Sequence, residues 1–254
     1  MLDDDARARF RADGFVVLRR AFDPKPVADE IDRAFADGLI ETADVNSGSG
    51  GVEFRCVTMT CERTPLSLAL LDALAEPAAE LLGRAVLPVR AKGTRYFGAS
   101  GWHRDSDLDI PSIGFVAYLE VVGAESGALR VRPGSHVGKV SVDDAYIVAT
   151  EPGDIVAFDE HLIHGSVGGR DRRQWRVDFV IDPVGADEEA VVRGYFARIY
   201  AVGWDSGCDV DLFPSYGAHW RSAQRPWTTR LEALGVYDRA DEQEDAMRRN
   251  RVGG

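Results

Sequence analysis

Apolar residues in the first part of the chain recur with the spacing of a helix. In the segment FDPKPVADEIDRAFADG, Val27, Ile31 and Phe35 stand four residues apart, which gives a helix one apolar face. Asp23 is expected to cap this helix, because its side chain can accept hydrogen bonds from unpaired backbone N–H groups. Gly38 is expected to end it.

Three further segments complete the N-terminal part, which we place at residues 1–84 and expect to be mostly helical. Residues 8–19 predict a short helix that leads into the strand GFVVL. Residues 39–60 contain SGSGG and are expected to form a loop, with the composition of a lid. Residues 65–83 are rich in Leu and Ala and predict a helix that is interrupted near Pro77.

From about residue 85 the apolar positions follow the pattern of β-strands. Strand-like runs are separated by Gly, Pro and Asp: AVLPVRA, GTRYFG, SIGFVAYLEVV, GALRVRPGSH, VSVDDAYIVAT, GDIVAFD and RQWRVDFVID. Many short strands at this spacing indicate a sandwich or barrel, not a parallel α/β sheet. We therefore expect a mainly β fold with flanking helices, whose core at about residues 85–185 is a double-stranded β-helix of the jelly-roll or cupin-like kind.

The tail, residues 186–254, combines aromatic pieces such as YFARIYAVGWD with a helical end at TTRLEALG. We expect it to extend the same domain, so that residues 1–254 form one unit. A chain of 254 residues, 45% hydrophobic and 28% charged, suits one large globular domain. The aromatic part is a candidate for a cap over the site or for a dimer contact, and the pattern leaves the oligomeric state open.

Charge and cysteine content exclude several classes of partner. A net charge of −12 argues against binding to nucleic acid or to an anionic membrane, since both need a dense basic patch. No run of about 18 apolar residues is present, so no membrane span is predicted, and MLDDDARARF lacks the apolar centre of a secretory signal. The odd number of cysteines, Cys56, Cys61 and Cys208, fits a reducing cytoplasm, and we interpret them as ordinary thiols.

Acidic residues and a histidine gather in the stretch GWHRDSDLDIPSIGF. His103, Asp105, Asp107 and Asp109 stand at intervals of two residues. In a strand, residues two apart share a face and lie about 6.6 Å apart, so His103 and Asp105 could chelate one ion, whereas Asp107 at about 13 Å is too far from His103. The pair alone is weak evidence, because a solvated acidic edge explains it equally well.

A further ligand is available in EPGDIVAFDEHLIHGSVGG, where a predicted strand leads to His161 and His164. The next strand alternates, so that Arg176 and Asp178 share a face opposite to that of Trp175. Two histidines and one carboxylate hold three positions of an octahedral ion and leave three open, which is how non-haem Fe(II) activates O2 beside a chelating co-substrate. The ordered set of residues is far less expected by chance than any one of them.

With these motifs the chain resembles the phytanoyl-CoA dioxygenase family of Fe(II)- and 2-oxoglutarate-dependent oxygenases over roughly residues 8–182. FRADGFVVLRRAFDP is similar to the opening of that family, GWHRDS to its W-H-x-D motif, GALRVRPGSH to its G-A-L-x-x-x-P-G-S-H motif, and GDIVAFDEHLIHGS to its strand leading to H-G-S. The resemblance implies Fe(II), 2-oxoglutarate and O2 as cofactor and co-substrates. It also implies the release of succinate and CO2.

The resemblance assigns the iron ligands to His103, Asp105 and His164. His164 is preferred to His161 because it stands directly before the Gly-Ser of the H-G-S motif. In the family the serine of this motif, here Ser166, helps to bind the distal carboxylate of 2-oxoglutarate.

An arginine completes the binding of that carboxylate in the family, eleven positions after the second histidine. This chain has Trp175 at that position. Arg176, one position later, is the preferred candidate, and Arg173 is the alternative. Because side chains alternate along a strand, only one of these two arginines can enter the barrel.

We predict from the resemblance a dioxygenase that hydroxylates an unactivated C–H bond of a small molecule in specialised, natural-product metabolism. Asp105 favours oxygenation, since halogenating relatives lack the carboxylate, while desaturation, cyclisation and epimerisation stay open. Basic and aromatic side chains that could line the mouth make an anionic substrate plausible: Arg55, Lys92, Arg95, Tyr96 and Trp102. The alternatives are a cupin-type metal enzyme that does not use 2-oxoglutarate, and a jelly roll that binds a metal or ligand without turnover.

Overall fold

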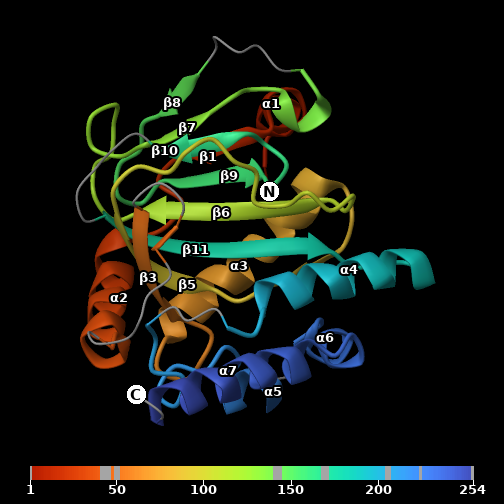
Figure 1. Ribbon diagram of the computed structural model, residues 1–254. Coiled ribbons are helices and arrows are strands. Elements are labelled where there is room, and N and C mark those ends of the chain that lie inside the picture. Colours follow the sequence, from red (N-terminus) through yellow and green to blue (C-terminus); the bar gives the residue numbers. More distant parts are fainter. Residues whose placement is uncertain are drawn as a thin grey trace.

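The strands form two antiparallel sheets that lie above a group of helices (Figure 1). A computed structural model describes residues 2–40, 47–48, 52–139, 145–166, 172–203, 207–222 and 225–252. Within these residues the large sheet has the order β1-β9-β6-β11-β5-β3-β2, with β4 also paired to β11, and the small sheet has the order β10-β7-β8. The mainly β jelly-roll core with flanking helices is therefore confirmed.

The strands have the following bounds: β1 Phe15–Leu18, β2 Ser47–Gly48, β3 Val52–Thr58, β4 Val86–Pro88, β5 Lys92–Phe97, β6 Ser112–Tyr118, β7 Leu129–Val131, β8 Tyr146–Val148, β9 Ile155–Asp159, β10 His164–Ser166 and β11 Arg172–Ile181. The helices are α1 Asp4–Asp13, α2 Pro24–Gly38, α3 Pro65–Leu82, the short 3-10 helix η1 Ser135–Val137, α4 Ala186–Ile199, α5 Ala218–Ser222, α6 Thr228–Ala233 and α7 Val236–Val252.

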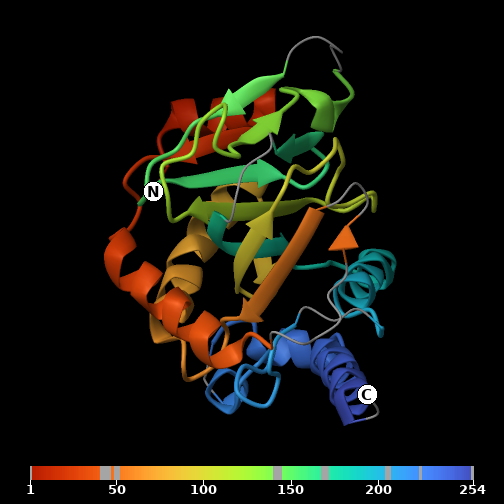
Figure 2. The same ribbon diagram turned by 60° about the vertical axis from the view of Figure 1, so that its left-hand side comes forward.

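Strand β11 separates the apolar core from the interior of the barrel. The outward side chains Trp175, Val177 and Phe179 are fully buried against the helices, and the Trp175 Nε1–H donates to Ser67 Oγ of α3 at 2.7 Å. Figure 2 shows α2 and α3 together on this side of the large sheet. The predicted alternation is confirmed, and it directs polar side chains, including Arg176, into the barrel.

Two of the predicted helices form almost as expected. The side chain of Asp23 accepts the Lys25 N–H at 3.2 Å and caps α2, which ends at Gly38.

Helix α3, however, continues through Pro77, so the predicted interruption is wrong. Proline removes a backbone donor from the helix, and the buried leucines on either side, Leu74 and Leu81, hold the helix against the core.

The predicted loop at residues 39–60 is wrong in its last part. Residues 52–58 form β3, and Glu53 to Thr58 of this strand pair with β5. A strand of this kind depends on a partner far along the chain, and the adjacent glycines dominate the local pattern. The SGSGG stretch, residues 47–51, lies mostly outside the described residues, so its role as a lid stays a prediction.

The tail is more helical than expected. Residues 186–199 form α4, whose buried side chains Val192, Tyr195 and Phe196 have helical spacing. Aromatic side chains of the tail pack into the main hydrophobic core, where the Tyr216 ring lies 5.4 Å from the Trp220 ring. The helices of the tail gather at the end of the large sheet that is opposite to the small sheet (Figures 1 and 2). None of the described helices is long and apolar enough to cross a membrane.

Candidate metal centre

The segment between β5 and β6 crosses the open edge between the two sheets. It is not a strand: His103 forms an isolated bridge to His164 of β10, with N···O distances of 2.9 Å in both directions. Two residues later the Asp105 N–H donates to the Glu160 backbone oxygen at 3.0 Å. The expectation that His103 and Asp105 share a face of a strand is therefore wrong, and backbone contacts to residues 160–164 bring them together instead.

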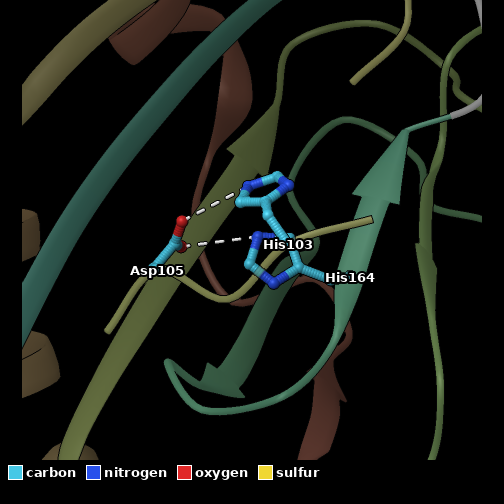
Figure 3. Close-up of side chains that lie close together, drawn as sticks. All are labelled: His103, Asp105 and His164. Carbon is cyan, nitrogen blue, oxygen red and sulfur yellow. Dashed lines mark ion pairs between the residues drawn. The ribbon is translucent and has the colours of Figure 1, made fainter. Parts of the chain in front are cut away.

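These contacts place the predicted iron ligands side by side (Figure 3). His103, Asp105 and His164 each offer a donor atom, and the three atoms lie within 4.8 Å of one another. The Nε2 atoms of His103 and His164 are each 3.5 Å from an oxygen of Asp105. This spacing fits one ion bound about 2.0–2.2 Å from each ligand, as is usual for nitrogen and carboxylate ligands.

The backbone fixes which nitrogen of each histidine faces the site. The Nδ1–H of His103 donates to the Gly101 oxygen at 2.8 Å, and the Nδ1–H of His164 donates to the Leu162 oxygen at 2.9 Å. A carbonyl oxygen can only accept, so Nδ1 carries the proton in both rings. The Nε2 lone pairs are then free to bind a metal, which is the arrangement that metal-binding histidines commonly use.

Electrostatics favour the ligand forms of Asp105 and His164. Burial is the largest single influence and opposes ionisation of Asp105, but Arg176 and the two histidines together outweigh it and hold the pKa of the carboxyl well below its usual range. Burial lowers the pKa of His164 and keeps its imidazole neutral. The pKa of His103 is raised, chiefly because its protonated ring can donate a hydrogen bond to Asp105.

Gly165 lets the segment around His103 approach β10. A Cβ atom at Gly165 would lie 2.8 Å from the Gly101 oxygen and 2.9 Å from the Ser100 oxygen, both of which are backbone atoms. We expect Gly165→Ala to move His103 away from His164 and to weaken Co(II) binding, measured by titration of metal-free protein, about 10-fold or more.

Gly101→Ala is the matched control for this substitution. Nothing lies within 4 Å of the corresponding Cβ position at Gly101, although that residue belongs to the same segment. Co(II) affinity should therefore stay at the wild-type value in Gly101→Ala. Equal affinity in Gly165→Ala would show that the close approach does not position the ligands.

A cavity opens beside the triad, inside the barrel. Its wall includes the rings of Tyr96, Tyr118 and Phe158 together with the polar side chains of Ser166 and Arg172. Pockets with a few polar groups on largely apolar walls are typical of small-molecule sites. The lining beside the triad thus suits an organic co-substrate.

The two predicted anchors for 2-oxoglutarate have different surroundings. Arg173 lies outside the barrel, where its Nη1 is 2.6 Å from Asp32 and its Nε 2.5 Å from Glu120. Arg176 lies inside, and it donates to Asp105 Oδ2 and to Asp178 Oδ1, both at 2.7 Å. Arg176 therefore contacts a metal ligand directly, and its role as the anchor stays a prediction.

Arg172 is a site residue that the sequence analysis missed. It is 3% exposed, and its Nη2 lies 3.3 Å from Ser166 Oγ and 3.0 Å from the Gly98 oxygen. Strand alternation could have found it, because residues 172 and 176 point to the same face. The family's spacing of eleven residues leads from His164 to Trp175 and passes over Arg172, which is the eighth residue after His164.

Among the candidate substrate residues, two face the barrel. Tyr96 lines the cavity, and Lys92 lies on the same face of β5, with its Nζ 3.8 Å from Asp178 Oδ2. Trp102 does not line the cavity: its ring lies between the guanidinium groups of Arg130 and Arg132, at 4.4 and 4.7 Å. Trp102 therefore stabilises the segment next to His103 by packing against these two arginines.

The remaining two candidates lie on the outer face of the large sheet. Arg95 borders a surface hollow with Asp32 and Arg173, and it pairs in register with Arg55 of β3. The Arg55 Nη1 donates to the Ile40 oxygen at 3.3 Å. These two arginines are therefore not at the cavity, because they take the alternate face of their strands.

A jelly roll whose cavity carries two histidines and one carboxylate defines a class of metal-dependent proteins in which this donor set suits Fe(II). The chain belongs to the phytanoyl-CoA dioxygenase (PhyH) family, whose model matches residues 10–174. Membership of this family makes iron and 2-oxoglutarate the cofactor and co-substrate, and the triad fits Fe(II). A search of curated proteins gives no match.

Solved structures share the fold. AviO1 from Streptomyces viridochromogenes Tue57 is 23% identical, with a TM-score of 0.55 over 73% of this chain and 98% of that chain. EvdO2 from Micromonospora carbonacea var. aurantiaca, complexed with 2-oxoglutarate, is 17% identical, with a TM-score of 0.57 over 73% and 94%. SnoN, a non-haem α-ketoglutarate-dependent epimerase from nogalamycin biosynthesis, is 18% identical, with a TM-score of 0.59 over 70% and 80%.

Proposed function

We propose that this protein is an Fe(II)- and 2-oxoglutarate-dependent oxygenase that hydroxylates an unactivated C–H bond of a small molecule in natural-product metabolism. The observation that carries the proposal is the convergence of His103, Asp105 and His164 beside a cavity with an arginine and a serine in its wall. The metabolic setting is supported by the structural similarity to SnoN, an epimerase from nogalamycin biosynthesis.

The residues of the chain hold the reactants in place. His103, Asp105 and His164 would hold Fe(II), which when bound supplies the redox chemistry that couples oxidation of 2-oxoglutarate by O2 to hydroxylation of the substrate. The apolar rings of the cavity wall, Phe158 and Tyr118, exclude water from this chemistry. The products are the hydroxylated substrate, succinate and CO2, which together account for both oxygen atoms of O2.

Arg172 and Ser166 are the pair that we assign to the distal carboxylate of 2-oxoglutarate. Their donors lie 3.3 Å apart in the wall of the cavity and come from β11 and β10. A guanidinium fork beside a hydroxyl suits a carboxylate, because it offers several donors in one plane. Arg176 is less suited, because its Nε and Nη2 already donate to carboxylates of the protein.

Anaerobic visible absorption tests the proposed function. Fe(II) and then 2-oxoglutarate are added to metal-free protein, and a weak charge-transfer band that needs both additions is expected. Metal binding without this band would favour the cupin-type enzyme that does not use 2-oxoglutarate. Absence of metal binding would leave the fold without the proposed chemistry.

The mass of the product distinguishes the reaction outcomes once a substrate supports succinate release. Hydroxylation adds one oxygen atom, desaturation or cyclisation removes two hydrogen atoms, and epimerisation leaves the mass unchanged. We expect the gain of oxygen; Asp105 argues only against halogenation, so the mass of the product decides between hydroxylation and the other three outcomes.

A further inference from the structure

Helix α4 reaches the back of the metal centre from outside the region that the family model matches, which ends at residue 174. In Figure 1 it lies next to the end of β11. The Tyr195 hydroxyl donates to Glu160 Oε2 at 3.0 Å, and both side chains are buried, at 3% and 2% exposure for the two residues. A buried tyrosine of the tail thus binds a buried carboxylate behind the triad.

Glu160 is connected to the iron ligand Asp105 in two ways, directly through its backbone oxygen and indirectly through Arg176. Its backbone oxygen accepts the N–H groups of Asp105 and Ser106, at 3.0 and 3.2 Å. Its carboxylate Oε1 lies 3.5 Å from Arg176 Nη2, the same nitrogen that donates to Asp105 Oδ2 at 2.7 Å. A continuous set of contacts therefore runs from Tyr195 through Glu160 and Arg176 to Asp105.

The Tyr195 hydroxyl matters because several carboxyl groups share the donors of Arg176. Three carboxyl groups, those of Asp105, Glu160 and Asp178, face this single guanidinium in a largely buried place. Burial, with Asp178 and Asp105 nearby, raises the pKa of Glu160 to about 8, so its side chain is held by hydrogen bonding more than by charge. Without the Tyr195 hydroxyl, the Glu160 side chain would lose the donor that holds its Oε2 and could turn toward Arg176 Nη2, which would then hold Asp105 less firmly.

A second contact joins the last turn of the same helix, three residues after Tyr195, to the segment that carries Asp105. Arg198 in the last turn of α4 forms an ion pair with Asp107. Both side chains are largely exposed, so this pair contributes little to stability. The contact matters for the arrangement of the helix, because it places the last turn of α4 beside Asp107, two residues after Asp105.

We propose that α4 is part of the metal centre, and that Tyr195 is a positioning residue that acts on Asp105 through Glu160 and Arg176. The inference rests on the proposed function, because it takes Asp105 as a ligand of the ion. It gives the tail a role in the chemistry of the site, in addition to covering the end of the sheet.

The test is Tyr195→Phe, with Tyr200→Phe as the matched control. Tyr200 is 2% exposed, stands directly after α4 and donates to the Tyr216 hydroxyl at 2.8 Å, so both substitutions remove one buried tyrosine hydroxyl from the same region. Metal-free protein is titrated with Co(II) and followed by its visible absorption. Tyr195→Phe should weaken Co(II) binding about 10-fold and alter the band shape, as changes behind a metal ligand typically do, while Tyr200→Phe should leave both unchanged.

A double variant separates positioning from general loss of stability. In an Arg176→Lys background the contact chain is already broken, so adding Tyr195→Phe should lower Co(II) affinity less than about twofold. Thermal unfolding of the metal-free proteins shows that each variant is folded. Wild-type affinity in Tyr195→Phe, an equal loss in Tyr200→Phe, or full additivity with Arg176→Lys would overturn the inference.

Co(II) binding by the wild-type protein distinguishes a failure of this inference from a failure of the proposed function. If wild-type protein fails to bind Co(II), the metal centre itself is overturned and the inference falls with it. If wild-type protein binds Co(II) and Tyr195→Phe binds it equally well, the metal centre stands and only the role of α4 is overturned.

Discussion

Asp105→Ala is expected to abolish succinate release and to reduce metal binding by more than the ~10–100-fold that changes behind a ligand cause. Asp105 is the carboxylate of the triad, and its charge balances the ion. Without it, Arg176, which now donates to Asp105 Oδ2 at 2.7 Å, would face the ion with no ligand carboxylate between them. Metal content after dialysis against Fe(II) or Co(II), together with succinate assays, measures both effects.

Asp109→Ala provides the control within the same acidic stretch. Asp109 is exposed and stands four residues after Asp105, in a bend of the chain. Its removal changes the net charge by the same amount but should leave metal binding and succinate release intact. Unchanged turnover in Asp105→Ala would remove the basis for the triad.

Arg172→Gln is expected to raise the KM for 2-oxoglutarate about 10–100-fold, because a hydrogen bond to a charged group contributes about 1.5–3 kcal/mol. The substitution removes the charge and the fork of donors but keeps a polar side chain near Ser166. The KM from succinate release and the 2-oxoglutarate concentration that gives half of the charge-transfer band both report the change.

Arg173→Gln, at the neighbouring residue, is the matched control for Arg172→Gln. Its guanidinium contacts Asp32 and Glu120 on the outer face of the sheet, so the KM for 2-oxoglutarate should not change. Arg176→Gln separates the two inward arginines. A rise in KM in Arg176→Gln but not in Arg172→Gln would return the anchor to Arg176 and assign Arg172 a structural role.

Short-range sequence patterns predicted most of the elements that position the site. The alternation in RQWRVDFVID gave the two faces of β11, and the spacing in FDPKPVADEIDRAFADG gave α2. These patterns succeed because burial on one face of a strand or helix is imposed locally, residue by residue. Family resemblance then selected His103, Asp105 and His164, which the structure brings within 4.8 Å of one another.

The parts that sequence could not predict depend on contacts between distant residues. Arg172, the arginine that we propose as the anchor, is the eighth residue after His164, so a fixed count of eleven positions passes over it. Strand β3 owes its existence to pairing with β5. The contact of Tyr195 with Glu160 joins residues that are 35 positions apart, and no periodicity in either segment points to the other.

The bridge between His103 and His164 bears on the order in which the protein is assembled. His103 lies in the segment that follows β5, and His164 lies in β10. In the described part of the chain, the four strands β6 to β9 stand between these two ligands in the sequence. The ion can therefore bind tightly only after this long loop has closed, and it then acts as a cross-link that the unfolded chain does not have. Because a ligand that binds only the native state stabilises it by mass action, the stability of the barrel follows the concentration of available metal.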